Sequence, residues 1–178
     1  MERPASPSLA KVPRPVVAAS ALVLVIATAT ILAALAFEHL GGYAPCPLCL
    51  QQRYAYYFAV PASAVAMLLA RGQATGIARI LLILVALAFL ANTVAGIYHS
   101  GVEWTWWAGP GECAGAFELQ WREGGIVDTP VIRCDEAPWR FLGLSFAGWN
   151  AVISAVLAAV AAYGAARRQQ PHANFKRA

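Results

Sequence analysis

The chain has 178 residues, of which 60% are hydrophobic and only 12% are charged. A soluble domain carries about twice that fraction of charged residues, so the composition excludes an ordinary soluble protein and indicates a membrane protein. The formal net charge is +4, but the basic residues gather in a few segments and do not indicate nucleic-acid binding.

Four long apolar segments predict four membrane-spanning helices. A bilayer core of ~30 Å takes about 20 helical residues, and backbone surrounded by lipid has to satisfy its own hydrogen bonds. The first segment is longer than the ~7–15 apolar residues of a signal peptide, so we expect it to remain as a helix. The prediction is one all-α membrane domain over 1–178, a four-helix bundle with helices at about 16–37, 47–70, 77–98 and 144–166.

The distribution of Lys and Arg predicts the orientation of these helices, because basic residues collect in short cytoplasmic loops. The loop at about 99–143 holds seven acidic residues against three arginines. Both termini are therefore expected in the cytoplasm, with a short loop at about 38–46 and the long loop outside. The two tails and the connection between the second and third helices hold nine of the thirteen basic residues, namely Arg3, Lys11, Arg14, Arg71, Arg79, Arg167, Arg168, Lys176 and Arg177.

This topology puts all four cysteines on the outer side. Cys46 and Cys49 lie where the second helix begins, and Cys113 and Cys134 lie in the long loop. In a bacterial envelope the outer side is the oxidising one, where disulfides persist.

The stretch "PCPLCLQQR" at 45–53 combines features that stabilise a thiolate. Cys46 and Cys49 are three residues apart, close enough to bond, and Pro47 suits the first position of a helix. The helix N-terminus offers partial positive charge and free N–H groups, and Arg53 lies one turn after Cys49 with a charge that does not titrate. We interpret this pattern as a redox site.

Three other interpretations stay open from the residues alone. The cysteine pair could be a structural disulfide, although so small a loop restricts the unfolded chain little. Four cysteines could bind one zinc ion, although Cys113 and Cys134 lack the usual ligand spacing. Arg53 could be an interfacial anchor whose charge reaches the lipid headgroups.

Four segments together resemble the disulfide bond formation protein DsbB family of bacterial inner membranes. Beyond the segment around Cys46, they are "YHSGVEW" after the third helix, Cys113 in the long loop, and "CDEAPWRFLGLSFAGWN" leading into the fourth helix. The resemblance extends from the first helix to the last. The loop between Cys113 and Cys134 is slightly shorter than in the best-known members.

The resemblance implies a thiol:quinone oxidoreductase of the inner membrane, with redox sites facing the periplasm. Such proteins reoxidise a periplasmic thioredoxin-fold partner of the DsbA type and pass the electrons to ubiquinone or menaquinone. It implies that Cys46–Cys49 is the disulfide near the quinone and that Cys113–Cys134 exchanges with the partner. It also places Arg53 and His99 beside the quinone. No metal is expected.

Several residues have plainer interpretations as well. His99 could simply suit the C-terminal end of the third helix. Acidic residues beside the loop cysteines, Glu112 and Asp135, are expected to raise the thiol pKa values there. Tryptophans at 104, 106 and 107 are expected to form an interfacial belt, or less favourably a wall of the quinone pocket, and Trp139, Phe141 and Trp149 are expected to be packing anchors.

Three alternative functions remain. One is a DsbB-like oxidase dedicated to a single client protein. Another is a quinone reductase of the vitamin K epoxide reductase type, which lacks the "FLGLS" segment seen at 141–145. The last is a four-span scaffold with structural disulfides, which should resist mild dithiols.

Overall fold

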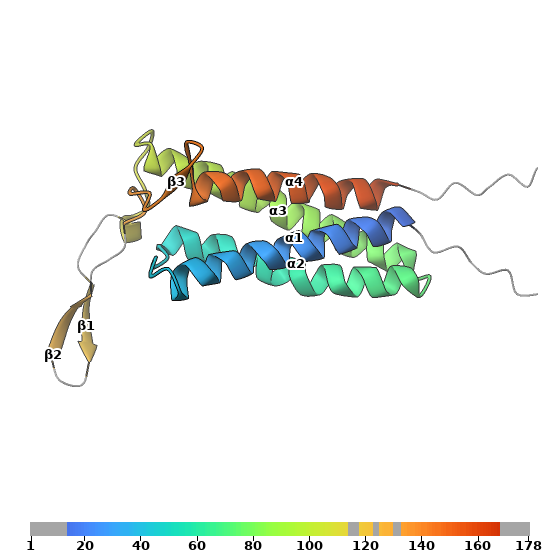
Figure 1. The fold of residues 1–178 in the computed structure, drawn as a ribbon, viewed down its shortest axis with the longest axis horizontal. Helices are drawn as coiled ribbons and strands as arrows, with labels where there is room; N and C mark the ends of the chain where they lie inside the picture. Colours follow the sequence, from blue (N-terminus) through green and yellow to red (C-terminus); the bar gives the residue numbers. More distant parts are fainter. Residues whose placement is uncertain (1–13, 114–117, 123–124, 130–132, 168–178) are drawn as a thin grey trace, which may run out of the picture.

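A computed structural model describes residues 14–113, 118–122, 125–129 and 133–167. Its framework is four long helices, each antiparallel to the next along the chain (Figure 1). They are α1 (Arg14–His39), α2 (Pro47–Arg71), α3 (Thr75–Glu103) and α4 (Phe146–Ala166). Each helix packs against two neighbours, and α1 and α4 close the ring, so the four helices form a bundle.

The two ends of the bundle carry different groups. At one end lie the start of α1, the connection from α2 to α3, and the end of α4 (Figure 1). The other end carries Cys46, the last turn of α3 and the connection from α3 to α4. Five of the basic residues used to predict the orientation, Arg3, Lys11, Arg168, Lys176 and Arg177, lie outside the described residues, as does Glu123.

Small residues line the contacts between the helices. Gly96 of α3 faces Ala151 of α4 so closely that an added Cβ would come within 2.9 Å of the Ala151 Cβ. Gly164 similarly faces Ala19 of α1. In a membrane the hydrophobic effect does not drive helices together, because lipid tails are as apolar as the side chains. Helices there associate largely through such close packing.

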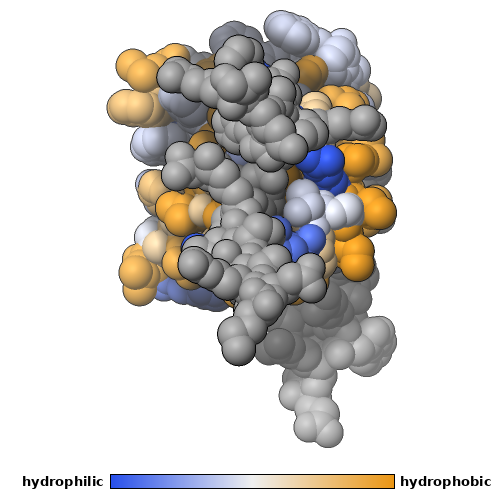
Figure 2. Space-filling view, turned by 90° about the vertical axis from the view of Figure 1, so that its right-hand side faces the viewer, coloured by the Kyte–Doolittle hydropathy of each residue, from blue (hydrophilic) through white to orange (hydrophobic). Residues whose placement is uncertain are grey.

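Large apolar side chains cover the outside of the bundle. Leu87, Leu90 and Val94 of α3 are each more than half exposed, and hydrophobic residues form much of both flanks in the end view of Figure 2. Such a surface is typical of contact with lipid. Three helices, α1, α3 and α4, are long and apolar enough to cross a membrane by length and composition.

Helix α2 is not among these three candidate spans. Its first two turns carry Gln51, Gln52 and Arg53, and tyrosines follow, which lowers its hydropathy. The prediction of four helices is confirmed, whereas the sequence-based count of four spans remains a prediction for α2.

Helix boundaries differ from the sequence prediction by one or two residues at both ends of α1, at the end of α2 and at the starts of α3 and α4, and by five residues at the end of α3. Helix α3 continues five residues beyond the predicted end, to Glu103, because its last turn is buried at His99 and Val102 and packs against the cysteine-bearing loops. Helix α4 begins at Phe146, two residues late, because Ser145 caps it by accepting a hydrogen bond from the Gly148 N–H.

The connection between α3 and α4 contains regular structure that the apolar segments did not predict. A short 3-10 helix, η1 (Gly111–Cys113), precedes an antiparallel hairpin of β1 (Glu118–Arg122) and β2 (Gly125–Thr129) that pairs Glu118 with Thr129. A second small hairpin joins β3 (Arg140–Phe141) to β4 (Leu144–Ser145).

Candidate functional site

The N-terminus of α2 holds the first cysteine pair. The helix begins at Pro47, as the sequence predicts, and Cys46 is the N-cap residue. Its Sγ accepts a hydrogen bond from the Cys49 N–H at 3.2 Å. The two sulfurs are not bonded to each other in this structure. The Cys49 side chain and burial raise the pKa of Cys46, which favours Cys49 as the sulfur that carries charge when the pair holds one.

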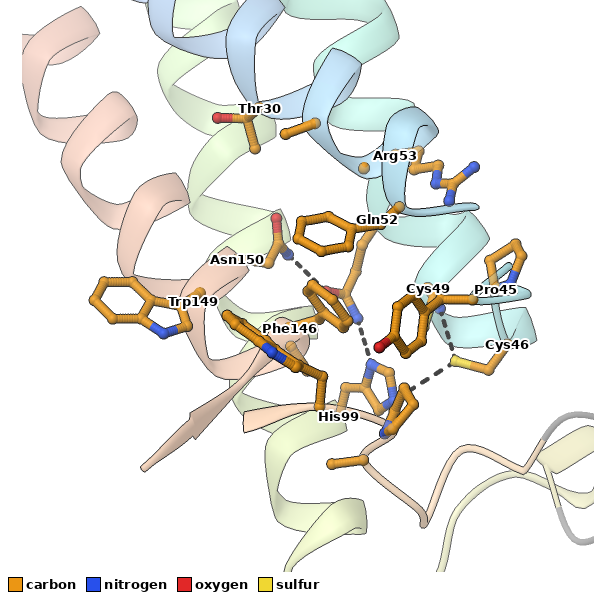
Figure 3. Close-up of a pocket in the computed structure, with 18 of the residues that line it drawn as sticks. Thr30, Pro45, Cys46, Cys49, Gln52, Arg53, His99, Phe146, Trp149 and Asn150 are labelled. Carbon is orange, nitrogen blue, oxygen red and sulfur yellow. Dashed lines mark hydrogen bonds between the residues drawn. The ribbon is translucent and has the colours of Figure 1, made fainter. Parts of the chain in front are cut away.

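His99 lies against this pair from the last turns of α3. Its ring is buried, with Nε2 3.6 Å from the Cys46 Sγ (Figure 3). The amide of Gln52 donates to Nδ1 at 2.9 Å, so a neutral His99 carries its proton on Nε2, facing the sulfur. The resemblance placed His99 beside the quinone, which stays a prediction, and the structure puts its ring beside the Cys46 sulfur.

A chain of buried polar side chains continues from His99 between the helices. Gln52 accepts from Asn150 at 2.6 Å, and Asn150 accepts in turn from the Tyr56 hydroxyl at 2.8 Å. Asn92 donates to Ser154 at 2.9 Å and also reaches Asn150 at 3.3 Å. These bonds link α2, α3 and α4 inside the bundle, where unpaired polar groups would be costly. The sequence analysis did not predict this network.

Arg53 has a partner that the sequence analysis did not identify. Its guanidinium bonds the carboxylate of Glu38, near the end of α1, at 2.5 Å. The two side chains are 12% and 23% exposed, so the pair is largely shielded from water. Both Arg53 and Cys49 still line the same cavity. The positive charge predicted beside Cys49 is therefore balanced by the negative charge of Glu38.

The cavity has a volume of about 900 Å³ and lies among α1, α2, α4 and the loop before β3. Cys46, Cys49, Arg53 and His99 all line it, so the structure brings these four predicted residues to one site (Figure 3). The remaining wall is mainly apolar and aromatic, and includes Phe37, Tyr43, Trp139, Phe146, Trp149 and Ile153.

The tryptophans divide into two groups. Trp139 stacks on Phe146 with ring centres 5.0 Å apart, and with Trp149 it lines the cavity, so these two do more than anchor the packing. Trp104, Trp106 and Trp107 are exposed and are not among the described residues that line the cavity. The less favoured prediction that they wall the pocket is not supported, and their place in an interfacial belt remains a prediction.

The second cysteine pair forms a disulfide. Cys113 and Cys134 are bonded, and their side chains are only 2% and 1% exposed. With Cys46, Leu48 and Val102 they form one buried cluster, against which Cys49 packs. The backbone of Cys134 also interacts with the His99 ring. The loop pair is therefore buried beside the helix pair.

Charges beside the loop pair are compensated. Asp135 accepts two bonds from Arg133, at 3.0 and 2.6 Å, which hold the pKa of its carboxyl below the ordinary value. The arginine offsets the negative charge of Asp135, and the expected effect of that acid on the Cys134 thiol stays a prediction. The side chain of Glu112 lies outside the described residues.

Glu103 is a further member of the site that the sequence analysis treated only as a loop acid. Its carboxylate lies 4.0 Å from the His99 Nε2 and accepts a hydrogen bond from the Ser145 hydroxyl. It also lines the cavity. The signal that could have found it is its spacing of four residues from His99, which puts both on one helix face.

Comparison with known proteins identifies the family. The sequence profile described as "Disulfide bond formation protein DsbB" matches residues 17–164. The disulfide bond formation protein B of Marinobacter nauticus is 33% identical over 158 residues, covering 84% of this chain and 92% of the relative. That of Aromatoleum aromaticum is 29% identical over 143 residues, covering 74% and 81%. No solved structure gives a significant match. The chain therefore belongs to the DsbB family of membrane proteins that act in disulfide bond formation.

Proposed function

We propose that the chain reoxidises a periplasmic thioredoxin-fold dithiol oxidase of the DsbA type and passes the electrons to ubiquinone or menaquinone. The observation that carries this proposal is one apolar cavity lined by Cys46, Cys49, Arg53 and His99, with the Cys113–Cys134 disulfide packed beside it. Oxidation of thiols by a lipid-soluble acceptor needs a dithiol, a fixed positive charge and a flat apolar binding surface in one place.

The residues of the cavity fit a quinone head group. Trp139 and Phe146 offer stacked aromatic faces, His99 lies 3.6 Å from the Cys46 sulfur, and Arg53 lines the same cavity. When bound, the quinone would supply the oxidising power by taking up two electrons and two protons. Arg53 would stabilise negative charge on a neighbouring oxygen, and the aromatic walls would keep water away.

The cysteines would pass electrons by two disulfide exchanges. A partner thiolate attacks the Cys113–Cys134 bond, forming a mixed disulfide and releasing one loop thiolate. The partner's second thiol resolves that mixed disulfide, and the loop pair, now reduced, opens the Cys46–Cys49 disulfide in the same way. The burial of both pairs in one cluster supports this second exchange. Each exchange breaks one S–S bond for each that it forms.

The free sulfurs of Cys46 and Cys49 match one stage of this cycle. With Cys113–Cys134 bonded, the arrangement corresponds to the protein after internal exchange and before the helix pair is oxidised again. At this stage the Nε2–H of His99 faces Cys46, and Arg53 lines the cavity with Cys49. We assign His99 to orienting the Cys46 sulfur and Arg53 to the side of the electron acceptor.

The proposal includes the membrane topology predicted from the sequence. Helix α2, held in the bundle between α1 and α3, would be the fourth span, and the end with the cysteines would face the periplasm. Reporters active only in the cytoplasm should work when fused after Arg71 and should fail at Gly125 of β2. A cytoplasmic signal at Gly125 would overturn the topology.

The direct test uses the full-length protein in lipid nanodiscs with a reduced thioredoxin-fold partner and a soluble quinone analogue. We expect quinone reduction that depends on both the protein and the partner. A protein whose disulfides resist mild dithiols and reduce no quinone would instead be a scaffold with structural disulfides. A panel of partners separates a general oxidase, which oxidises several, from one dedicated to a single client.

A further inference from the structure

Three side chains of the site that could bind a metal ion lie close together. The sulfurs of Cys46 and Cys49 and a ring nitrogen of His99 all lie within 4.8 Å of one another. Cys46 and His99 are 3% and 2% exposed, so neither is free to turn away into water. We propose that the reduced cysteine pair and His99 form a binding site for a thiophilic divalent cation of the Zn²⁺ type.

The distances agree with the coordination chemistry of zinc. Thiolate and imidazole ligands at ~2.3 and ~2.0 Å from a tetrahedral ion stand roughly 3.5–3.8 Å from each other. The His99 Nε2 and the Cys46 Sγ are already 3.6 Å apart. The Cys49 sulfur lies within 4.8 Å of both atoms, so its half-buried side chain would have to rotate toward them to reach the same spacing. The cavity leaves the fourth position open to water or another small ligand.

Gln52 supplies the support that a metal-bound histidine needs. When Nε2 binds a metal, Nδ1 carries the proton and donates it to an acceptor. The Gln52 side chain lies 2.9 Å from Nδ1. Half a turn of its amide presents the carbonyl oxygen there. A matching turn of Asn150 keeps the two amides hydrogen-bonded, while Asn150 Oδ1 gives up the bonds that it accepts from Tyr56 and Asn92. The same two residues can thus serve both forms of His99.

The local charge also favours a cation when the pair is reduced. Two thiolates bring two negative charges, and the Glu103 carboxylate lies 4.0 Å from the His99 Nε2. Among the described residues, two arginines line the cavity, and each is paired with an acid, Arg53 with Glu38 and Arg133 with Asp135, so they leave little net positive charge to repel a metal ion. The site therefore suits a dication in the reduced state.

Binding is restricted to the reduced state because a disulfide has no thiolate to offer. On binding, two S–H bonds and the Nε2–H bond of His99 break, two protons leave, one proton is regained at Nδ1, and two metal–sulfur bonds and one metal–nitrogen bond form, so nothing is oxidised. Within the proposed function, a bound ion would withdraw the helix pair from the redox cycle. Zinc would then act as a reversible inhibitor of the reduced protein and leave the oxidised protein unaffected.

The experiment uses Co²⁺ as a spectroscopic probe on the full-length protein in nanodiscs, reduced with a phosphine under argon. The parent is a Cys113→Ala/Cys134→Ala variant, which leaves only the helix pair as thiols, and the natural sequence is run in parallel. We expect one equivalent of Co²⁺ to give tetrahedral d–d bands and thiolate charge-transfer bands, both abolished by Zn²⁺. The same protein oxidised before the titration should give neither band.

Variants identify the ligands. Cys49→Ser and Cys46→Ser should each lose charge-transfer intensity, and His99→Ala should bind Co²⁺ with altered d–d bands and at least ~10-fold lower affinity. Gln52→Leu should weaken binding by about 10–100-fold, as loss of a histidine's hydrogen-bond partner does in metal sites. His39→Ala, which removes an exposed histidine outside the site, should leave the titration unchanged.

The outcomes decide between the site and its alternatives. Equal Co²⁺ affinity and unchanged bands in His99→Ala, or equal binding by the oxidised protein, would overturn the proposal. Circular dichroism of each variant checks that loss of binding does not come from unfolding, and Cys49→Ser changes a single atom, so it keeps the shape of the site. The readout uses neither partner nor quinone, so a failure of quinone reduction with intact Co²⁺ bands would count against the proposed function alone.

Discussion

The two cysteine pairs differ in what holds their sulfurs in place. Cys46 and Cys49 are three residues apart on a helix start, where the N-cap geometry and His99 fix the sulfurs without a bond between them. Cys113 and Cys134 are separated by 21 positions that include a hairpin, and a covalent bond joins them. The helix pair is positioned by the bundle, whereas the loop pair is held by its own disulfide and by burial.

This difference suggests a division of work. A pair at a helix start is held by the backbone of the bundle, which keeps its position toward the cavity. The loop cysteines lie on the connection between α3 and α4, so their surroundings can rearrange when their disulfide opens. Because the loop disulfide is buried, attack by a partner requires the cover over Cys113 and Cys134 to move first.

The largest expected effect comes from breaking the loop pair. Cys134→Ser removes one half of the loop disulfide that a partner thiolate would attack, so turnover should fall on the order of 10³-fold or more. When the oxidised partner is added, the remaining Cys113 thiolate should open the partner's disulfide and form a mixed disulfide with it, as measured by non-reducing gels and mass spectrometry. Ala108→Ser, a polar change in the same connection that spares the sulfurs, is the control. Absence of an adduct on either loop cysteine in the single variants would show that the relay order is wrong.

The sequence predicted the framework and the chemistry of the helix pair because both depend on local features. Four apolar segments give four helices, and Pro47 after a cysteine gives the helix start. Contacts between helices had no such signal. The bond from Arg53 to Glu38 and the bonds from Gln52 to His99 and Asn150 depend on how the helices are rotated against one another.

The connection between α3 and α4 was predicted least well. Its hairpins are short, and their strands lack the long alternating pattern that marks a strand in a sequence. The continuation of α3 to Glu103 was missed because "HSGVE" at 99–103 ends the apolar segment with polar residues and a glycine, which argues against a helix. Burial of Val102 against the cysteine cluster outweighs that local preference.

Arg53 tests the cavity side of the helix pair. Arg53→Ala should lower kcat/KM for the quinone analogue by about 10–100-fold, because it removes a fixed charge near the acceptor, and should leave partner exchange at the loop pair intact. Arg53→Lys should be milder but still impaired, since it loses the planar fork. The measurement is the rate of quinone reduction against quinone concentration.

Glu38→Gln is the matched control for Arg53. It keeps the arginine but removes its balancing charge, so the guanidinium should be freer to act in the cavity, and the rate should not fall. An unchanged quinone rate and affinity in Arg53→Ala would reduce Arg53 to a packing partner of Glu38 and an anchor at the interface.

A smaller contrast should appear within the helix pair itself. In the fully reduced protein, Cys49 is half-buried and Cys46 is buried, so a maleimide should modify Cys49 faster, by about tenfold. Mass spectrometry of proteolytic fragments over time measures the two rates. Labelling after denaturation in detergent should make them similar. Faster modification of Cys46 in the folded protein would contradict the assignment of Cys49 as the more reactive sulfur.

The smallest effect is expected beside the loop pair, at Arg133. In the folded protein the bond to Arg133 lowers the pKa of Asp135, so this bond stabilises the fold above the ordinary Asp pKa of about 3.9 and ceases to do so as the pH falls through the lowered value. Arg133→Gln should remove this acid-sensitive contribution and leave Asp135 uncompensated near Cys134. The loop thiol should then ionise at higher pH, and exchange with the partner at neutral pH should slow by less than about tenfold. Because the pair is exposed, the effect should shrink in high salt.

The double variant Arg133→Gln/Asp135→Asn tests whether Arg133 acts through its charge. If it does, removing the charge of Asp135 as well should restore the exchange rate, measured against pH in both variants. A slow rate that Asp135→Asn does not restore would mean that Arg133 acts through its packing and not through its charge.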